Sequence, residues 1–317
     1  MDKLAAGRPR RPRKAAETPA FQPNIIAHSR PLEIEEPINR YFLHPIARAL
    51  VRILIPTGIS PNAVSVLSVV MMALACACYA LLPWPVSAFA GVVFHMGWHV
   101  FDGADGDLAR RTGKSSPIGE IVDGVCDHLS HLILYLTLGY LVARQVGPWG
   151  WAVTVASAAS RALQAVCYET ARRNYRRWVY GLNWIRQDLG KAGKKAGGVG
   201  RVGVALAGAY LKMSEWVRAD DREIEAVMSR LMTRSKPVAT KARNLYQANG
   251  RGLVKQASWL STDWETIGVF LSILAGSPLY FLVFQATVIN LVIAACVWNQ
   301  KRCYQRLLPQ LLALEKR

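Results

Sequence analysis

The segment 101-FDGADGDLARRTGKSSPIGEIVDGVCDHLSH-131 places acidic side chains at the join between two strongly apolar stretches. An aspartate at the centre of a membrane helix costs about 2.5–3.5 kcal/mol on insertion scales, so such residues are kept where they face a polar space or bind a ligand. Their spacing along the chain indicates which structure this segment forms. The carboxylates are Asp102, Asp105, Asp107, Glu120, Asp123 and Asp127.

Helical periodicity puts four of the carboxylates on two facing surfaces. One face has the spacing i, i+3, i+4 and i+7, and it consists of Asp102, Asp105, Gly106 and Ala109. The next helix has the spacing i, i+4 and i+8, and its face consists of Gly119, Asp123 and Asp127. Between them, 112-TGKSSP-117 contains Gly and Pro and predicts a turn. The segment is therefore predicted to be a helical hairpin that aims four carboxylates into one space.

Four oxygen ligands at one site favour a hard divalent cation, Mg²⁺ or Mn²⁺, over zinc. Two such ions would neutralise a pyrophosphate and polarise the phosphorus under attack. Gly106 and Ala109 leave room for a flat ligand on the same face, and Arg110 adds a cation suited to phosphate oxygens. The same pattern also fits an intramembrane path for divalent cations, so a transporter is the alternative to an enzyme.

The rest of the chain combines a net charge of +18 with 52% hydrophobic residues, and the two are segregated. Apolar stretches at 61–82, 86–101 and 119–142, and a fourth after 146-VGPWGW-151, predict four membrane spans. Residues 264–299, broken by 275-AGSP-278, predict two more. The fold class is therefore all-α: a polytopic membrane protein with six transmembrane helices, an N-terminal interfacial helix and a helical insert.

The interfacial helix is predicted within 37–56, where apolar and basic positions interleave at helical spacing. Its predicted apolar positions are Tyr41, Leu43, Ile46, Leu50 and Ile53.

Charge and hydropathy divide the chain into five parts. These are a basic arm predicted to be disordered (1–35), a membrane core (36–170), a basic insert with an amphipathic helix at 206–232 (171–262), spans five and six (263–300), and a tail (301–317). Basic segments flank membrane spans on the cytoplasmic side. We therefore expect both termini, the insert and the acidic hairpin on the cytoplasmic face, in a bacterial inner membrane.

The basic insert also raises the hypothesis of a membrane-tethered nucleic-acid binder. Its first residues, 171-ARRNYRRWVYG-181, directly follow a span, which favours contact with anionic membrane lipids. We expect no nucleic-acid partner.

The order Asp102-x2-Asp105-Gly106-x2-Ala109-Arg110-x8-Gly119-x3-Asp123-x3-Asp127 resembles the signature of the CDP-alcohol phosphotransferase (CDP-alcohol phosphatidyltransferase) family. Every fixed position stands at the family spacing. In addition, 58-GISPNAVSVLS-68 resembles the family's Pro-Asn entry to its first transmembrane helix. The resemblance covers roughly 40–170 well, and 264–299 only as two further helices. The insert 171–262 has no counterpart.

The resemblance implies a six-helix membrane enzyme, usually a homodimer, whose site opens to the cytoplasm. It implies that an acceptor hydroxyl attacks the phosphorus of the CDP-linked donor distal to cytidine and releases CMP, in phospholipid or related lipid synthesis. By position, it makes Asp102, Asp105 and Asp123 ligands of a two-metal Mg²⁺ or Mn²⁺ site, and Asp127 the general base and a further ligand. It implies that the CDP donor is bound by Asn62, Gly106, Ala109, Arg110 and Gly119.

The acceptor and its binding residues stay open. Candidates are Arg161, inside an apolar run, and His131, one turn beyond Asp127; the competing interpretation is an interhelical ion pair and an interhelical hydrogen bond. The donor is either CDP-diacylglycerol with a polar acceptor or a CDP-linked headgroup with a lipid acceptor. The segment 115-SSPIGEIVDGVCD-127 resembles the choline/ethanolamine phosphotransferase branch and favours the second, whereas the predicted number of spans argues against that branch.

Overall fold

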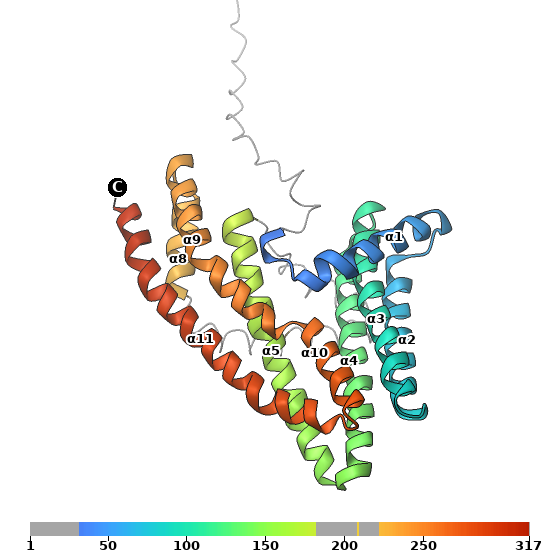
Figure 1. Cartoon of the computed structure of the whole chain (residues 1–317). Helices are drawn as coiled ribbons and strands as arrows, with labels where there is room; N and C mark the ends of the chain where they lie inside the picture. Colours follow the sequence, from blue (N-terminus) through green and yellow to red (C-terminus); the bar gives the residue numbers. More distant parts are fainter. Residues whose placement is uncertain (1–31, 182–207, 209–221, 317) are drawn as a thin grey trace, which may run out of the picture. The chain divides into compact units, whose positions relative to one another are not determined.

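The computed structural model describes residues 32–181, 208 and 222–316, and these residues form helices with no strand among them (Figure 1). The all-α prediction is confirmed. The arm before residue 32 and most of 182–221 lie outside the described residues, as does much of the helix predicted at 206–232.

Helices stand at all six positions predicted for membrane spans. They are α2 (Pro61–Leu81), α3 (Val86–Arg111), α4 (Pro117–Val146), α5 (Trp149–Tyr180), α10 (Thr262–Leu274) and α11 (Leu279–Glu315). Within the described part of the chain, α2, α4 and α11 are long and apolar enough to cross a membrane. α10 has only 13 residues, fewer than the ~20 needed for a straight span. The chain thus has the helices of a membrane protein, and the number of spans stays a prediction.

The helices α2 and α4 begin with the same local device, a serine N-cap followed by proline. Ser60 Oγ accepts a hydrogen bond from the Ala63 amide at 3.2 Å, and Ser116 Oγ accepts one from the Gly119 amide at 3.0 Å. A side-chain cap satisfies an amide that the first turn leaves unpaired, and proline suits the first helical position. These starts place Asn62 and Gly119 in the first turns of their helices.

The predicted hairpin consists of α3, a short turn and α4, and α2 packs against both helices (Figure 1). The chain reverses through Gly113, whose φ of +68° lies in the left-handed region that glycine adopts without a steric penalty. The core between the three helices contains the buried side chains of Met72, Tyr79, Trp98 and Leu134.

Helix α1 (His44–Leu54), preceded by η2 (Asn39–Leu43), occupies the segment predicted to be interfacial. Its buried stripe packs against α3 and differs from the predicted apolar face, with which it shares only Leu43. The predicted positions Tyr41, Ile46 and Ile53 are exposed instead. The helix thus has two apolar stripes, one packed against protein and one left exposed. Helical periodicity alone did not show which apolar positions belong to which stripe. The buried stripe is Leu43, Ala47, Val51 and Leu54.

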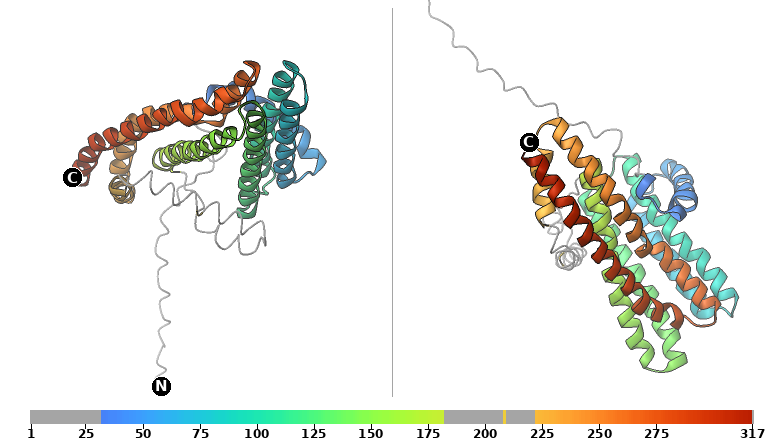
Figure 2. Two further views of the ribbon diagram at one scale, coloured as in Figure 1. Left: turned by 90° about the horizontal axis from the view of Figure 1, so that it is seen from below. Right: turned by 60° about the vertical axis from the view of Figure 1, so that its left-hand side comes forward.

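Helices α5 and α11 are longer than a bilayer requires. At about 1.5 Å per residue, the 37 residues of α11 span roughly 55 Å, against about 30 Å of hydrocarbon. Their far ends pack with α8 (Arg222–Met232) and α9 (Lys236–Ala257), and Figure 2 shows α9 and α11 side by side. The described part of the insert is therefore a helical bundle built on extensions of the core helices.

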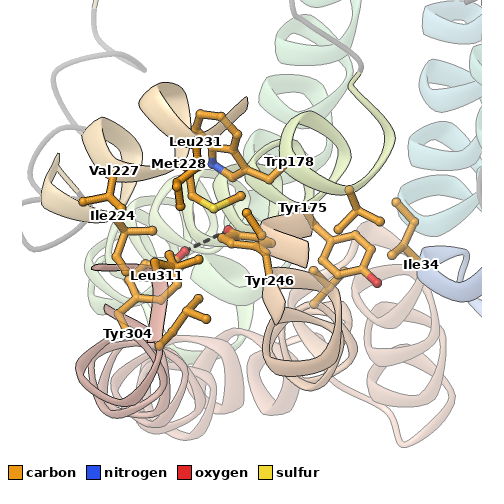
Figure 3. Close-up of a cluster of buried hydrophobic side chains, with 14 residues drawn as sticks. Ile34, Tyr175, Trp178, Ile224, Val227, Met228, Leu231, Tyr246, Tyr304 and Leu311 are labelled. Carbon is orange, nitrogen blue, oxygen red and sulfur yellow. Dashed lines mark hydrogen bonds between the residues drawn. The ribbon is translucent and has the colours of Figure 1, made fainter. Parts of the chain in front are cut away.

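A hydrophobic cluster holds this bundle together (Figure 3). Met228 and Leu231 of α8, Tyr246 of α9 and Leu311 of α11 are buried in it. The hydroxyls of Tyr246 and Tyr304 lie 3.1 Å apart, joining α9 to α11. Burial of aromatic and aliphatic side chains on four elements explains why the insert has ordered helices despite its basic composition.

The turn η1 (Leu32–Ile34) lies inside the arm predicted to be disordered, yet it is anchored to the bundle. Glu33 accepts hydrogen bonds from Tyr175 at 2.8 Å, from Tyr180, and from Gln247 Nε2 at 3.2 Å. Burial by itself would raise the pKa of Glu33, but these hydrogen bonds and the charge of Arg251 lower it below its usual value. The last residues of the arm predicted to be disordered, Glu33 and Ile34, are therefore packed against the bundle.

Candidate active site

The hairpin brings Asp105 of α3 and Asp123 of α4 together. Their carboxyl groups interact electrostatically across the two helices. Asp105 is 5% exposed, whereas Asp123 is exposed. Ser65 of α2 donates to Asp105 Oδ2 at 2.5 Å, and the Gly106 amide donates to Oδ1. Two carboxyls in contact repel when both are ionised, so this pair is suited to share a proton or a cation.

Asp127 and Asp102 border the same space. Asp127 interacts electrostatically with Asp105 and Asp123, and all four carboxylates act on the thiol of Cys126. Asp127 Oδ1 is buried and has no hydrogen-bond partner in the part of the chain that the structure describes. The four aspartates that helical spacing placed on facing surfaces are therefore gathered at one end of the hairpin.

Residues predicted to bind the nucleotide lie around these carboxylates. A Cβ atom added to Gly119 would lie 3.6 Å from Asn62 Oδ1, so the first turns of α2 and α4 are in contact. A Cβ atom added to Gly106 would lie 3.3 Å from Arg110 Nη1, which extends over the glycine. Arg110 Nη2 is also 3.7 Å from Asp107 Oδ1. Ala109 is half-buried on the same helix.

The donor set fits a hard divalent cation because it consists of carboxylates, one with an unpartnered buried oxygen. Among the residues that the structure describes, no three acidic, histidine or cysteine side chains already stand in a metal-binding arrangement.

A second buried polar cluster lies on the apolar side of the carboxylates and contains both predicted acceptor residues. Arg161 Nε of α5 donates to Glu265 Oε2 of α10 at 2.6 Å, and His131 Nε2 of α4 is 3.4 Å from the same oxygen. Tyr135 donates to Glu265 Oε1 at 2.9 Å. The interhelical ion pair considered for Arg161 is present, and its partner is Glu265. Glu169, on the same face of α5, pairs with Arg173 instead.

The predicted site omits several residues of these clusters. Glu265 interrupts the apolar run 264-WETIGVFLSIL-274. An isolated acidic residue in such a run indicates a functional or ion-paired side chain, so the sequence could have identified Glu265. Ser65 and Gln285 carry no such signal, because serine and glutamine are common in polar segments. Only the packing of α2 on α3 and of α11 on α5 brings them to Asp105 and to the second cluster.

Helical packing, membrane-span-capable helices and a carboxylate-lined hairpin together define a membrane protein with an acidic site between two helices. Residues 58–210, just under half of the chain, match the family model described as CDP-alcohol phosphatidyltransferase. Neither the curated proteins nor the solved structures contain a match. The matched segment includes the hairpin, all four aspartates and Arg161, but excludes α10 and Glu265.

The family implies a transferase that uses a CDP-alcohol donor and a hydroxyl acceptor in phospholipid synthesis. Its members generally depend on a divalent metal. The resemblance inferred from the aspartate spacing is thereby confirmed.

Proposed function

We propose that the protein is a membrane-embedded, Mg²⁺- or Mn²⁺-dependent transferase that moves a phospho-alcohol group from a CDP-linked donor to a hydroxyl acceptor and releases CMP. The observation that carries this proposal is the cluster of Asp102, Asp105, Asp123 and Asp127 inside the matched family segment. A cation transporter would need the carboxylates, but it has no need of Asn62 and Arg110 beside them.

In this proposal Asp102, Asp105, Asp123 and Asp127 hold the divalent ions, which when bound neutralise the donor's diphosphate. Arg110 contacts phosphate oxygens. The binding site for the nucleotide is lined by Asn62, Gly106, Ala109 and Gly119. The missing Cβ atom of Gly106 matters because a larger side chain would meet the Arg110 guanidinium.

Asp127 is proposed as the general base. It takes the proton from the acceptor hydroxyl as the acceptor oxygen forms a bond to the phosphorus distal to cytidine. The bond from that phosphorus to the CMP oxygen breaks, and CMP leaves with the electron pair. Its unpartnered Oδ1 leaves one oxygen available for that proton.

We further propose six spans, with α3, α5 and α10 beside the three apolar helices; the 13 residues of α10 would cross where the bilayer is locally thinned. The basic bundle, both termini and the aspartates would then face the cytoplasm, next to anionic lipids of a bacterial inner membrane. Exposed Tyr41, Ile46 and Ile53 support an interfacial α1. A homodimer is expected from the family resemblance.

The test is CMP release by the purified protein in lipid nanodiscs, measured with a panel of CDP-linked donors and hydroxyl acceptors. We expect release with Mg²⁺ or Mn²⁺, none after chelation, and recovery when the metal is returned. Asp127→Asn should keep donor binding and lose about 10²–10⁴-fold in rate, the usual contribution of a general base. Glu120→Gln, an exposed carboxylate on the same hairpin, is the matched control and should stay within twofold. Wild-type rates from Asp127→Asn would refute the base assignment.

A further inference from the structure

The helices α9 and α11 form a surface that the proposed reaction does not use. They lie side by side (Figure 2), and two contacts between them set their direction. Asn299 Nδ2 donates to Gln256 Oε1 at 3.0 Å, and the hydroxyl of Tyr304 lies 3.1 Å from that of Tyr246. The residue numbers rise along α11 as they fall along α9, so the two helices are antiparallel and share a seam.

The seam carries charge of one sign. α9 contains no acidic residue, and α11 contains only Glu315, at its far end. Glu33 of η1 reaches α9 at Arg251, where the two side chains are 3.8 Å apart. A surface with one sign of charge favours a partner of the opposite sign. The exposed cations next to the contact between Gln256 and Asn299 are Lys255, Lys301, Arg302 and Arg306.

Exposed tryptophans border these cations on the side of the proposed spans. Trp298 is 59% exposed and stands one turn before Arg302, whose guanidinium carbon lies 5.2 Å from the centre of the indole ring. Trp259 of η4 (Ser258–Leu260) is 56% exposed and stacks on Trp264 of α10, with ring centres 4.7 Å apart. Tryptophan is enriched at the boundary between membrane and water. These rings therefore mark the level at which α10 and α11 would enter the membrane.

The length of α11 agrees with this boundary. Residues 279–298 precede the cations and would span about 30 Å at about 1.5 Å per residue, which matches the thickness of the hydrocarbon. At the other end of these helices, Trp84 Nε1 in the predicted outside turn donates to the Leu274 carbonyl oxygen at 3.0 Å. The cations at 301–306 thus begin where the cytoplasmic lipid headgroups would lie.

The segment predicted from sequence to contact anionic lipids, 171–181, is mostly covered by other helices. Tyr175 and Trp178 are buried in the core of the bundle. Among the arginines of this segment, only Arg177 is exposed, and it lies 4.4 Å from the centre of the Trp178 ring. The accessible cations of the insert at membrane level are therefore those of the seam.

We infer that the seam of α9 and α11 binds the headgroup phosphate of anionic phospholipids in the cytoplasmic leaflet. Lys255 and Arg302 pair with the phosphate, while Trp259 and Trp298 lie beneath it among the ester groups. A nucleic acid would meet the same charge, but exposed tryptophans at the ends of membrane spans favour a lipid. Lipid binding requires α10 and α11 in the membrane, as proposed above, but neither the metal nor the CDP-linked donor. Because the carboxylates lie on α3 and α4, this lipid is a partner of the insert and not a substrate.

The experiment measures lipid binding by the purified full-length protein in detergent, without metal. Phosphatidylglycerol with a dansyl group on one acyl chain is the probe, and energy transfer from tryptophan reports its binding. We expect unlabelled phosphatidylglycerol to displace the probe about tenfold or more better than phosphatidylcholine, with a difference that shrinks as salt is raised. Equal displacement by the two lipids would overturn the inference. Because no turnover is measured, an inactive transferase would leave this result unaffected.

A charge-removing variant tests the position of the site. Lys255→Gln/Arg302→Gln should weaken phosphatidylglycerol binding roughly 25-fold, about fivefold for each cation. The matched control, Lys236→Gln/Lys316→Gln, removes the same charge from exposed positions at the far ends of the same helices. These positions lie about 20–30 Å along the helices from the seam, beyond the Debye length of about 10 Å, so binding should stay within twofold. Equal losses in both variants would show a diffuse attraction and overturn the site.

Trp298→Leu tests the aromatic border. It removes the ring beneath Arg302 and should weaken binding about two- to fivefold, as for one exposed cation–π contact. Trp149→Leu, at an exposed position near the opposite ends of the spans, is the control and should leave binding unchanged. An unchanged affinity in Trp298→Leu would contradict the placement of the headgroup beside this ring.

Two other occupants of the seam are tested with the same proteins. Displacement of the probe by a single-stranded oligonucleotide but not by phosphatidylglycerol would assign the seam to nucleic acid. A change from dimer to monomer in Lys255→Gln/Arg302→Gln, measured by light scattering, would assign it to a second copy of the chain. Either result overturns the lipid inference.

Discussion

The carboxylate hairpin and the second buried polar cluster are adjacent but are held together in opposite ways. The second cluster, called the Glu265 layer below, consists of His131, Tyr135, Arg161 and Glu265. In the hairpin, the carboxyl groups of Asp105 and Asp123 would repel each other if both were ionised, and Asp105 is supported by Ser65 and one backbone amide. In the layer, Arg161 and Glu265 are opposite charges, and Tyr135 fills a remaining acceptor position. Under the proposed function a bound cation would stabilise the hairpin, whereas Arg161 and Glu265 already offset each other's charge. Four predictions test this difference, from the largest effect to the smallest.

Asp105→Asn should separate activity from stability. The loss of a proposed metal ligand should lower CMP release by more than about 100-fold, since even outer-shell partners of metal sites contribute about 10–100-fold. The metal-free protein should become more stable, because one of two touching carboxyls is neutralised. Activity assays and thermal unfolding in detergent with chelator measure the two effects. A destabilised metal-free protein would mean that the carboxyl pair is not repulsive.

Glu265→Ala should have the opposite effect on the metal-free protein. Removing one partner of a buried ion pair costs about 3–5 kcal/mol, because the other charge is left uncompensated. The double variant Arg161→Met/Glu265→Ala should lose less than the sum of the two single losses, measured by denaturant unfolding. The control is Glu169→Ala, whose half-exposed pair with Arg173 within α5 should contribute at most about 0.5 kcal/mol. Equal losses in Glu265→Ala and the control would contradict a buried, balanced layer.

Gly150→Ala tests the helix contact that brings Arg161 toward α4. A Cβ atom at Gly150 would lie 2.7 Å from the Ala143 backbone nitrogen, so α5 would have to move away from α4. We expect a loss of about 1–3 kcal/mol, as for overpacking elsewhere. Gly252→Ala on α9 meets no atom within 4 Å and should instead stabilise by about 0.4–1 kcal/mol. Thermal unfolding of both variants decides whether close packing at Gly150 is required.

The anchor of η1 on the bundle should depend weakly on pH. The folded-state pKa of Glu33 is lowered, so its contribution is present above the unfolded-state pKa and is lost as the pH falls through the folded-state value. Stability measured from pH 6 down to 3 should therefore fall less steeply in Glu33→Gln than in the wild type. Parallel pH profiles would show that Glu33 adds no stability to the folded state.

The sequence by itself determined the helices, their order and the gathering of four aspartates. Serine caps, Pro117 and Gly113 set the ends of the hairpin locally, and a period of 3.6 residues leaves Asp105 and Asp123 on facing surfaces. The resemblance to the family, which the family model matches over residues 58–210, followed from the same spacing, because one local segment carries the whole pattern.

Only the tertiary structure decided which residues surround that hairpin. Glu265 reaches Arg161 and His131 across separations of more than 100 residues, and Gln285 reaches Ser157 in the same way. The buried stripe of α1 and the anchoring of Glu33 also depended on partners far along the chain. The physical reason is that local spacing fixes the face on which a side chain lies, whereas a buried charge or amide takes its partner from whichever helix packs against that face.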